Sequence, residues 1–200
     1  MYLEVSNLTR EKGYILSMAP ETGGTLQAGS RHNYVPKSVI VDEKRGVLLV
    51  VVDRGVLCVS DLDVRAEAEG FSKKKEYHIM VIGLAAAKTI SQTPLPDVRQ
   101  TVRDIAAQFA FSFAVTSERF HIAREYPGPP QEKRDSYIQM VDMPDVQMFY
   151  SVLNERLGIA LEVPPLHITT HAKSTNQKNN EMGIGVNSYE ELSKLIVVKI

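Results

Sequence analysis

The chain has 200 residues, of which 44% are hydrophobic and 24% are charged, values typical of a globular protein rather than a disordered or fibrous one. Its formal net charge of −1 excludes an overall basic field of the kind that binds duplex DNA, and its single cysteine cannot form an internal disulfide. The sequence has no apolar run close to the about 18 residues of a membrane span and no secretory signal. We therefore expect a cytoplasmic protein that binds neither membranes nor duplex DNA.

The first third of the chain contains short β-branched runs separated by turn residues. These runs lie at residues 14–18, 38–41, 47–52 and 56–59. Short strands joined by tight turns predict an antiparallel meander. Cys58 lies in the last run, where we expect a small buried hydrophobic side chain rather than a reactive thiol. We predict a β-rich extension over residues 1–70, packed on a core over residues 71–200.

A histidine stands near the start of the next predicted strand, which covers residues 76–83. Side chains alternate between the faces of a strand, so His78 and Met80 share one face and Tyr77 lies on the other. Three lysines precede this strand at residues 73–75. We interpret them as a solvated loop, and the alternative is that they attract phosphate toward His78.

The middle of the chain alternates between helix and strand patterns. Apolar residues recur at helical spacing over residues 97–109, and residues 145–158 begin with an acidic turn and end at glycine, as helices do. Strands are predicted over residues 111–115, 119–124 and 137–141. His121, within His-Ile-Ala-Arg, offers a rival first histidine motif. Only 46 residues (167 − 121) separate it from His167, which is short for a whole lobe, so a histidine on an edge strand is the favoured interpretation.

The stretch with the most chemistry, residues 167–173, follows two prolines that end whatever precedes it. Its Ile-Thr-Thr run is β-branched and favours a strand. In a regular strand the polar side chains share one face. They are His167, Thr169, His171 and Lys173. Two imidazoles, a hydroxyl and an ammonium suit an anion such as phosphate.

The spacing His-x-x-x-His also occurs in zinc proteases, but that motif needs a helix and a glutamate directly after the first histidine. This chain has Ile168 there, in a strand-like run, so no metal is expected. Beyond it we predict strands over residues 183–186 and 195–200. Between them lies a short helix over residues 188–192, opened by a capping box of Ser188 and Glu191.

The two His-Ile strands, 89 residues apart (167 − 78), resemble the 2H (two-histidine) phosphoesterase superfamily, whose signature is a pair of His-x-[Ser/Thr]-x strands. His167-Ile168-Thr169-Thr170 fits the signature fully, whereas His78-Ile79-Met80-Val81 has methionine in place of Ser or Thr. The resemblance covers residues 77–200. It implies an α+β fold, a two-lobed cyclic phosphodiesterase-like domain with antiparallel sheets lining a central cleft and helices outside. The family includes RNA 2′,3′-cyclic phosphodiesterases and RNA 2′-5′ ligases.

The resemblance also implies hydrolysis of a 2′,3′-cyclic phosphate on RNA or a nucleotide, with His78 and His167 as the acid/base pair and with no cofactor. The expected phosphate-binding side chains are Thr169, Lys173, His171 and Tyr77. Met80 cannot donate a hydrogen bond, so this half of the site needs another donor. The candidates are Lys173, Arg31, Tyr77 and a backbone amide.

Two other interpretations stay open from the sequence. One is a non-catalytic member of the same fold that binds nucleotides or RNA ends, and the other is a structural domain with incidental histidines. An enzyme needs both histidines to face one cleft within about 10 Å, close enough for one phosphate and its water to touch both. The sequence leaves open the substrate, the choice between hydrolase and ligase, the roles of the two histidines and the oligomeric state.

Overall fold

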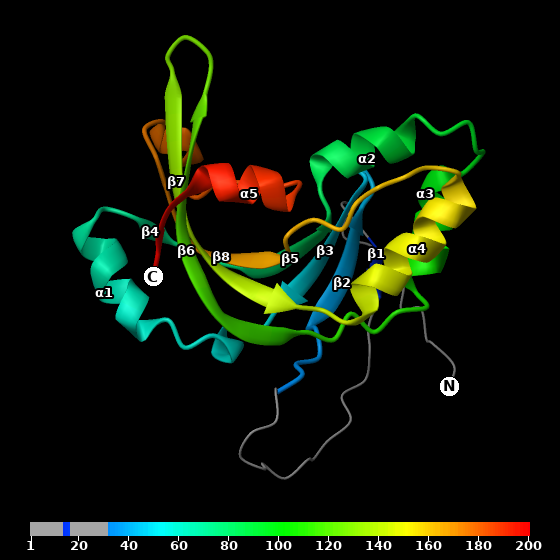
Figure 1. Cartoon of the computed structure of the whole chain (residues 1–200), viewed down its shortest axis with the longest axis horizontal. Coiled ribbons are helices and arrows are strands. Elements are labelled where there is room, and N and C mark those ends of the chain that lie inside the picture. Colours follow the sequence, from blue (N-terminus) through cyan, green and yellow to red (C-terminus); the bar gives the residue numbers. More distant parts are fainter. Residues whose placement is uncertain (1–13, 17–31) are drawn as a thin grey trace.

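In the computed structural model, residues 14–16 and 32–200 are described, and they form an α+β arrangement with one continuous sheet (Figure 1). The strands are β1 (Tyr14–Leu16), β2 (Ser38–Asp42), β3 (Val47–Val52), β4 (Ser72–Lys73), β5 (Tyr77–Ile82), β6 (Ala114–Tyr126), β7 (Glu132–Asp142), β8 (His167–Ser174) and β9 (Ile196–Lys199). The α-helices are α1 (Ser60–Ala68), α2 (Leu84–Ser91), α3 (Val98–Ala106), α4 (Asp145–Leu157) and α5 (Tyr189–Leu195). Two short 3₁₀ helices cover Arg54–Val56 and Gln177–Asn179.

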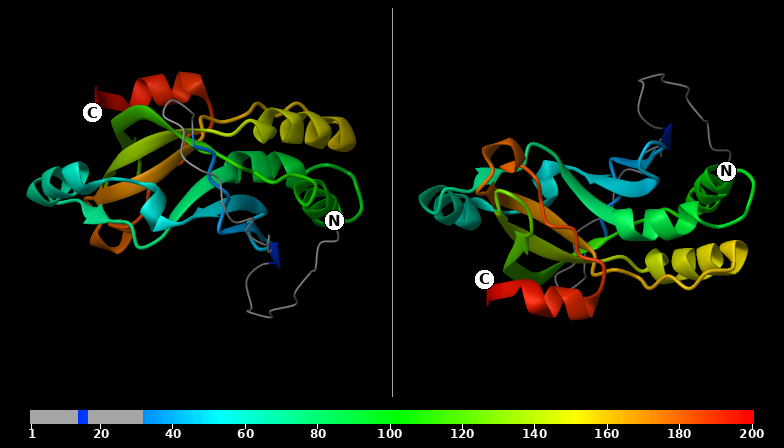
Figure 2. Two further views of the ribbon diagram at one scale, coloured as in Figure 1. Left: turned by 90° about the horizontal axis from the view of Figure 1, so that it is seen from below. Right: turned by 90° about the horizontal axis from the view of Figure 1, so that it is seen from above.

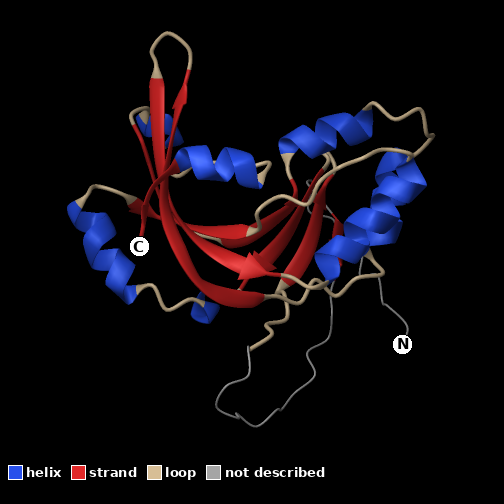
Figure 3. Ribbon diagram, in the orientation of Figure 1, coloured by secondary structure: helices blue, strands red, loops and turns tan. Residues whose placement is uncertain are grey.

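The strands follow the order β1-β2-β3-β5-β8-β7-β6-β9, and β4 pairs with β8 outside this path. Every pair of neighbouring strands is antiparallel. The sheet bends strongly along the long β6–β7 hairpin (Figure 3). The two strands predicted to carry the histidines, β5 and β8, are neighbours in its middle, although 84 residues (167 − 83) separate the end of one from the start of the other.

Elements with a strong sequence pattern form as expected. The apolar run of β3 is buried at all but one position. Helix α4 ends at Gly158, whose φ of 63° is left-handed and suits a residue without Cβ. Helix α5 begins at Ser188, whose side chain accepts a hydrogen bond from the amide of Glu191.

The two faces of the sheet pack against different partners. On one face, β-strand residues such as Val50, Ile79 and Ile168 join α2, α3 and α4 in the main apolar core. On the other face, Ile138 and Met140 pack against Ile184, Val186 and Leu192 in a smaller cluster that includes α5. Figure 1 shows α1 and α5 on opposite sides of the β6–β7 hairpin, and Figure 2 shows both at the opposite end of the molecule from α3 and α4.

Three local predictions are wrong. Residues 56–59 are not a strand but a 3₁₀ turn and a loop leading into α1, and Cys58 is exposed while its neighbours Leu57 and Val59 are buried. Residues 183–186 are not a strand and pair with no strand of the described chain, and their side chains Ile184 and Val186 pack onto the sheet instead. Residues 111–115 are also not a separate strand, since β6 begins at Ala114 and continues to Tyr126.

Strands β1 to β3 belong to the same sheet as the later strands. Ile40 of β2 pairs with Leu49 of β3, and Val51 of β3 pairs with His78 of β5. Residues 17 and 18 of the predicted strand at residues 14–18 lie outside the described residues. In the part of the chain that is described, no helix is long and apolar enough to cross a membrane.

Candidate functional site

The pairing of β5 with β8 brings the two histidine motifs together. Ile79 lies directly opposite Ile168, and both side chains are fully buried in the main core. The strands are antiparallel and side chains alternate, so the residues on either side of these two isoleucines point to the other face. His78 is therefore opposite Thr169, and Met80 is opposite His167.

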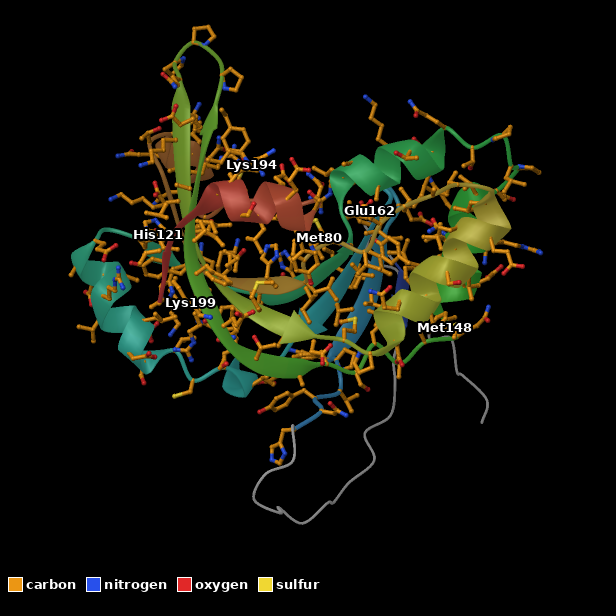
Figure 4. All side chains as sticks on the ribbon, in the orientation of Figure 1. Met80, His121, Met148, Glu162, Lys194 and Lys199 are labelled. Carbon is orange, nitrogen blue, oxygen red and sulfur yellow. The ribbon has the colours of Figure 1, made fainter. Side chains whose placement is uncertain are left out.

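The four side chains form a compact square on one face, which we call the histidine face. His78 and His167 occupy one diagonal, and diagonal neighbours on antiparallel strands are about 7–8 Å apart. All four side chains are partly buried, so they are neither sealed in the core nor fully in solvent. Figure 4 places Met80 near the centre of the molecule, between α5 and α2.

His167 is held by backbone on both sides. Its Nδ1 lies 2.8 Å from the carbonyl oxygen of Pro165, which can only accept, so Nδ1 carries the hydrogen of this bond. Burial lowers the pKa of His167 below 6.5, although hydrogen bonds to the backbone of Pro165 and Ile184 oppose the shift. At neutral pH the imidazole is therefore uncharged, which suits a proton acceptor.

His78 is uncharged at neutral pH for a related reason. Burial lowers its pKa, the positive charge of Lys74 lowers it further, and the carboxylate of Glu76 opposes both effects. The charge of a protonated His167 also lowers the pKa of His78. This coupling means that one histidine binds a proton more weakly once the other has one.

The segment that enters α5, residues 181–187, covers part of the histidine face, and we call it the covering segment. A Cβ on Gly183 would lie 2.8 Å from Oγ1 of Thr169, so the backbone here rests directly on the threonine and only glycine fits. At the other corner, a Cβ on Gly83 would lie 3.3 Å from Sδ of Met80 and 3.9 Å from Oδ1 of Asn187. The covering segment therefore spans the face from Thr169 to Met80.

The three lysines before β5 contact neighbouring segments. Lys73 and Lys75 are exposed, as the predicted solvated loop requires, whereas Lys74 is partly buried. Lys73 forms an ion pair with Asp63 at 2.6 Å. Lys74 donates to the carbonyl of Glu181, and Lys75 pairs with the carboxylate of the same residue at 2.6 Å. Lys74 is partly buried, and burial lowers its pKa. Two of these lysines thus anchor the covering segment beside His78.

The prediction that His171 and Lys173 share the face of His167 is wrong. The pairing with β7 shifts between Tyr137 and Ile138, because Thr169 is opposite Ile138 whereas His171 is opposite Tyr137. Thr170 is the extra residue of this bulge, and its insertion turns the rest of β8 over. The strand alternation on which the prediction rested therefore stops at Thr169.

Beyond the bulge, both side chains point toward α1. His171 is 2% exposed, with Nε2 3.0 Å from Oδ1 of Asp63 and Nδ1 3.1 Å from Oγ1 of Thr170. Lys173 donates to the carbonyl of Glu69 at 2.7 Å. These residues connect α1 to the sheet and cannot reach a phosphate on the histidine face.

The structure also supports neither Tyr77 nor Arg31 as the donor that replaces Met80. Tyr77 is 1% exposed and lies on the core face of β5, where its hydroxyl has no hydrogen-bond partner among the described residues. Its assignment to phosphate binding is therefore wrong. Arg31 lies outside the described residues. Of the predicted candidates a backbone amide is left, and the positive charge of Lys74 acts on His78.

The rival histidine, His121, lies on β6, which β7 separates from β8. Its Nε2 is 2.9 Å from Oδ1 of Asp135, and its ring contacts Phe71 and Tyr137 on the α1 side of the sheet. Figure 4 shows it on this flank, away from Met80. It therefore cannot act together with His167.

A cavity of about 260 Å³ lies beside the histidine face rather than on it. It is bounded by the turn between β2 and β3, by α2 and by α3, and neither histidine lines it. Sequence reasoning missed it, because its walls come from three elements that show no common motif.

Among the described residues, no group of three or more histidine, cysteine or acidic side chains is placed to hold a metal ion.

No family model, curated protein or solved structure matches this chain in the three comparisons with known proteins.

Proposed function

We propose that this protein is a metal-independent phosphoesterase that acts on a 2′,3′-cyclic phosphate of RNA or a nucleotide, and that its sheet is a two-lobed 2H phosphoesterase-like domain. The observation that carries the proposal is the register of β5 against β8. It places His78 and His167 on one face, diagonal to each other, with the hydroxyl of Thr169 opposite His78. A phosphate seated between the two rings is within reach of both.

The chemistry follows from the protonation states of the pair. One histidine, uncharged, takes a proton from water as the water oxygen attacks phosphorus. The P–O bond to one ribose oxygen breaks, and the second histidine, protonated, gives its proton to that oxygen. The product is a phosphate monoester, and the pair has exchanged its proton between the two rings. No metal is needed to generate the nucleophile.

Charge on the phosphorane intermediate needs hydrogen-bond donors. Thr169 supplies a hydroxyl on the β8 side, and the positive charge of Lys74 acts from the N-terminal side of His78. Met80 supplies no hydrogen-bond donor on its side of the site, so backbone amides of the covering segment have to act as donors at that corner. The substrate has to displace part of this segment, because Gly183 rests on Thr169.

A second function is a nucleotide-binding or RNA-end-binding protein without catalysis. The observation in its favour is Met80, which stands where a donor would stabilise the transition state but does not block binding. Loss of one such donor lowers turnover on the order of 100-fold or more. The two functions therefore differ in kcat and not in the location of the ligand.

The test is hydrolysis of adenosine 2′,3′-cyclic monophosphate, and of a short RNA ending in the same group, with EDTA present. We expect turnover in the wild type and a loss of on the order of 100-fold or more in both His78→Ala and His167→Ala. His32→Ala is the matched control, because His32 is exposed and lies outside the site.

Equal turnover in all three variants overturns the proposal. Absence of turnover in the wild type, together with saturable binding that His167→Ala abolishes, establishes the binding protein instead.

A further inference from the structure

The mouth of the cavity between the β2–β3 turn, α2 and α3 lies at the end of β5, close to the corner of Met80, whereas its inner wall belongs to the main core on the other face of the sheet. Leu84 lines the cavity and directly follows Gly83, which packs against Sδ of Met80. Arg45 lines it from the turn, and its positive charge is near enough to lower the pKa of His78. A molecule held at the two histidines and longer than a phosphoribose can therefore extend into this cavity.

The inner wall of the cavity is apolar. Val41, Ala87, Ile90 and Val102 line it, and each is at most 5% exposed. Leu84, at the rim, is 59% exposed. The volume of about 260 Å³ is below the about 300–1,000 Å³ of pockets that enclose drug-sized ligands. It suits one flat ring system rather than an extended chain.

The rim carries an excess of positive charge. Both acidic residues of the lining are already engaged, since Asp42 accepts from Nε of Arg45 at 2.7 Å and Glu43 pairs with Arg103. Lys44, Lys88 and Arg99 also line the cavity, and no side chain in residues 32–200 forms an ion pair with them. An apolar wall below a cationic rim selects a ligand with a flat uncharged body and an anionic group.

We propose that this cavity binds the terminal nucleobase of an RNA whose cyclic phosphate lies at the histidines, while the cationic rim binds the phosphate that joins this nucleotide to the preceding one. The inference rests on the proposed function and makes the substrate an RNA end rather than a mononucleotide. A mononucleotide has no such preceding phosphate, so it uses the apolar wall alone.

The experiment titrates ¹⁵N-labelled protein with two probes that are not substrates, the dinucleotide ApA carrying a 3′-phosphate and adenosine 3′-monophosphate. We expect the dinucleotide to shift the amide signals of Gly46, Ala87 and Ser91, and to bind more tightly than the mononucleotide. Lys88→Glu/Arg99→Glu should weaken dinucleotide binding about tenfold, the effect of two reversed surface charges. The milder Lys88→Gln/Arg99→Gln should weaken it less.

The control is Lys37→Glu/Arg156→Glu, which changes the net charge equally at two exposed positions away from the cavity. Equal weakening in this variant, or no shift of the three amides, overturns the inference. The proposed function fails separately. If the protein hydrolyses the cyclic phosphate but the amides at the cavity do not shift, the phosphoesterase stands and this subsite does not. If the dinucleotide binds at the cavity but no hydrolysis occurs, the subsite stands and the proposed catalysis is overturned.

Discussion

Met80 is the residue on which the efficiency of the proposed catalysis depends most. It lies opposite His167, in the position that mirrors Thr169 opposite His78. In the proposed mechanism, a threonine at position 80 would place a hydroxyl beside the phosphate without lengthening the side chain. In this half of the site the methionine replaces a donor by a thioether, which is a weak acceptor.

We predict that Met80→Thr raises kcat for the cyclic phosphate on the order of 100-fold, the lower end of the range measured for a single donor to an anionic intermediate. Met80→Val is the matched control, because valine has the shape of threonine without its hydroxyl. Steady-state kinetics on both variants measure the effect. If valine and threonine raise kcat equally, removal of the thioether rather than gain of a donor is responsible.

At the scale of elements, the bulge in β8 divides the strand into two parts with different tasks. His167 and Thr169 precede it and face the covering segment, whereas His171 follows it and faces α1. The hydrogen bond between His171 and Asp63, which are 108 residues apart in the chain, joins β8 to α1. Its contribution is therefore to stability and not to the site.

We predict that His171→Ala lowers the free energy of unfolding by about 2–4 kcal/mol, because it leaves a cavity and removes the partner of Asp63. Activity per folded molecule should stay at the wild-type level, since the side chain is on the other face. Urea denaturation and kcat measure the two effects. A double-mutant cycle with Asp63→Asn isolates the pair, and a coupling energy near zero contradicts this assignment.

The elements that sequence predicts well are those whose pattern is local. The continuous apolar run of β3, the helical spacing of α3 and the glycine at the end of α4 each determine their own element. The histidine face was partly predictable, because His167 begins β8 and His78 is the second residue of β5. The bulge at Thr170 was not, since nothing in a β-branched run marks where alternation breaks. The covering segment was mistaken for a strand, because extended apolar residues look alike whether they pair or pack.

At the scale of the whole molecule, the three histidines of β5 and β8 make stability depend on pH. Burial lowers the pKa of His78, His167 and His171 below 6.5, and Lys74, beside His78, and Lys73, beside His171, add to this effect. The carboxylates of Glu76 and Asp63 oppose it without reversing it. The folded protein therefore binds protons more weakly than the unfolded chain, in which histidine has its ordinary value of about 6.5.

The direction in which stability changes with pH follows from this difference in proton binding between the folded protein and the unfolded chain. Above pH 7 the histidines are uncharged in the folded and the unfolded state, and their contribution to the free energy of unfolding is fully present. As the pH falls through 6.5, the unfolded chain takes up protons that the folded protein does not, so the free energy of unfolding decreases. We expect the urea midpoint to fall between pH 7.5 and 5, and to fall less steeply in His78→Gln/His167→Gln. An unchanged slope in this variant contradicts the assignment to the two histidines.

The same lowered pKa values set the pH at which the proposed enzyme works best. The pair needs one protonated and one uncharged ring, and at pH 7 most molecules have neither protonated. We predict that kcat/KM rises as the pH falls from 8 and reaches its maximum below 6.5, at the pH where folding stability has begun to decrease. A maximum above pH 7 means that the acid is not one of these histidines. Lys74 is then the group to replace, because it is the charged side chain that most strongly lowers the pKa of His78.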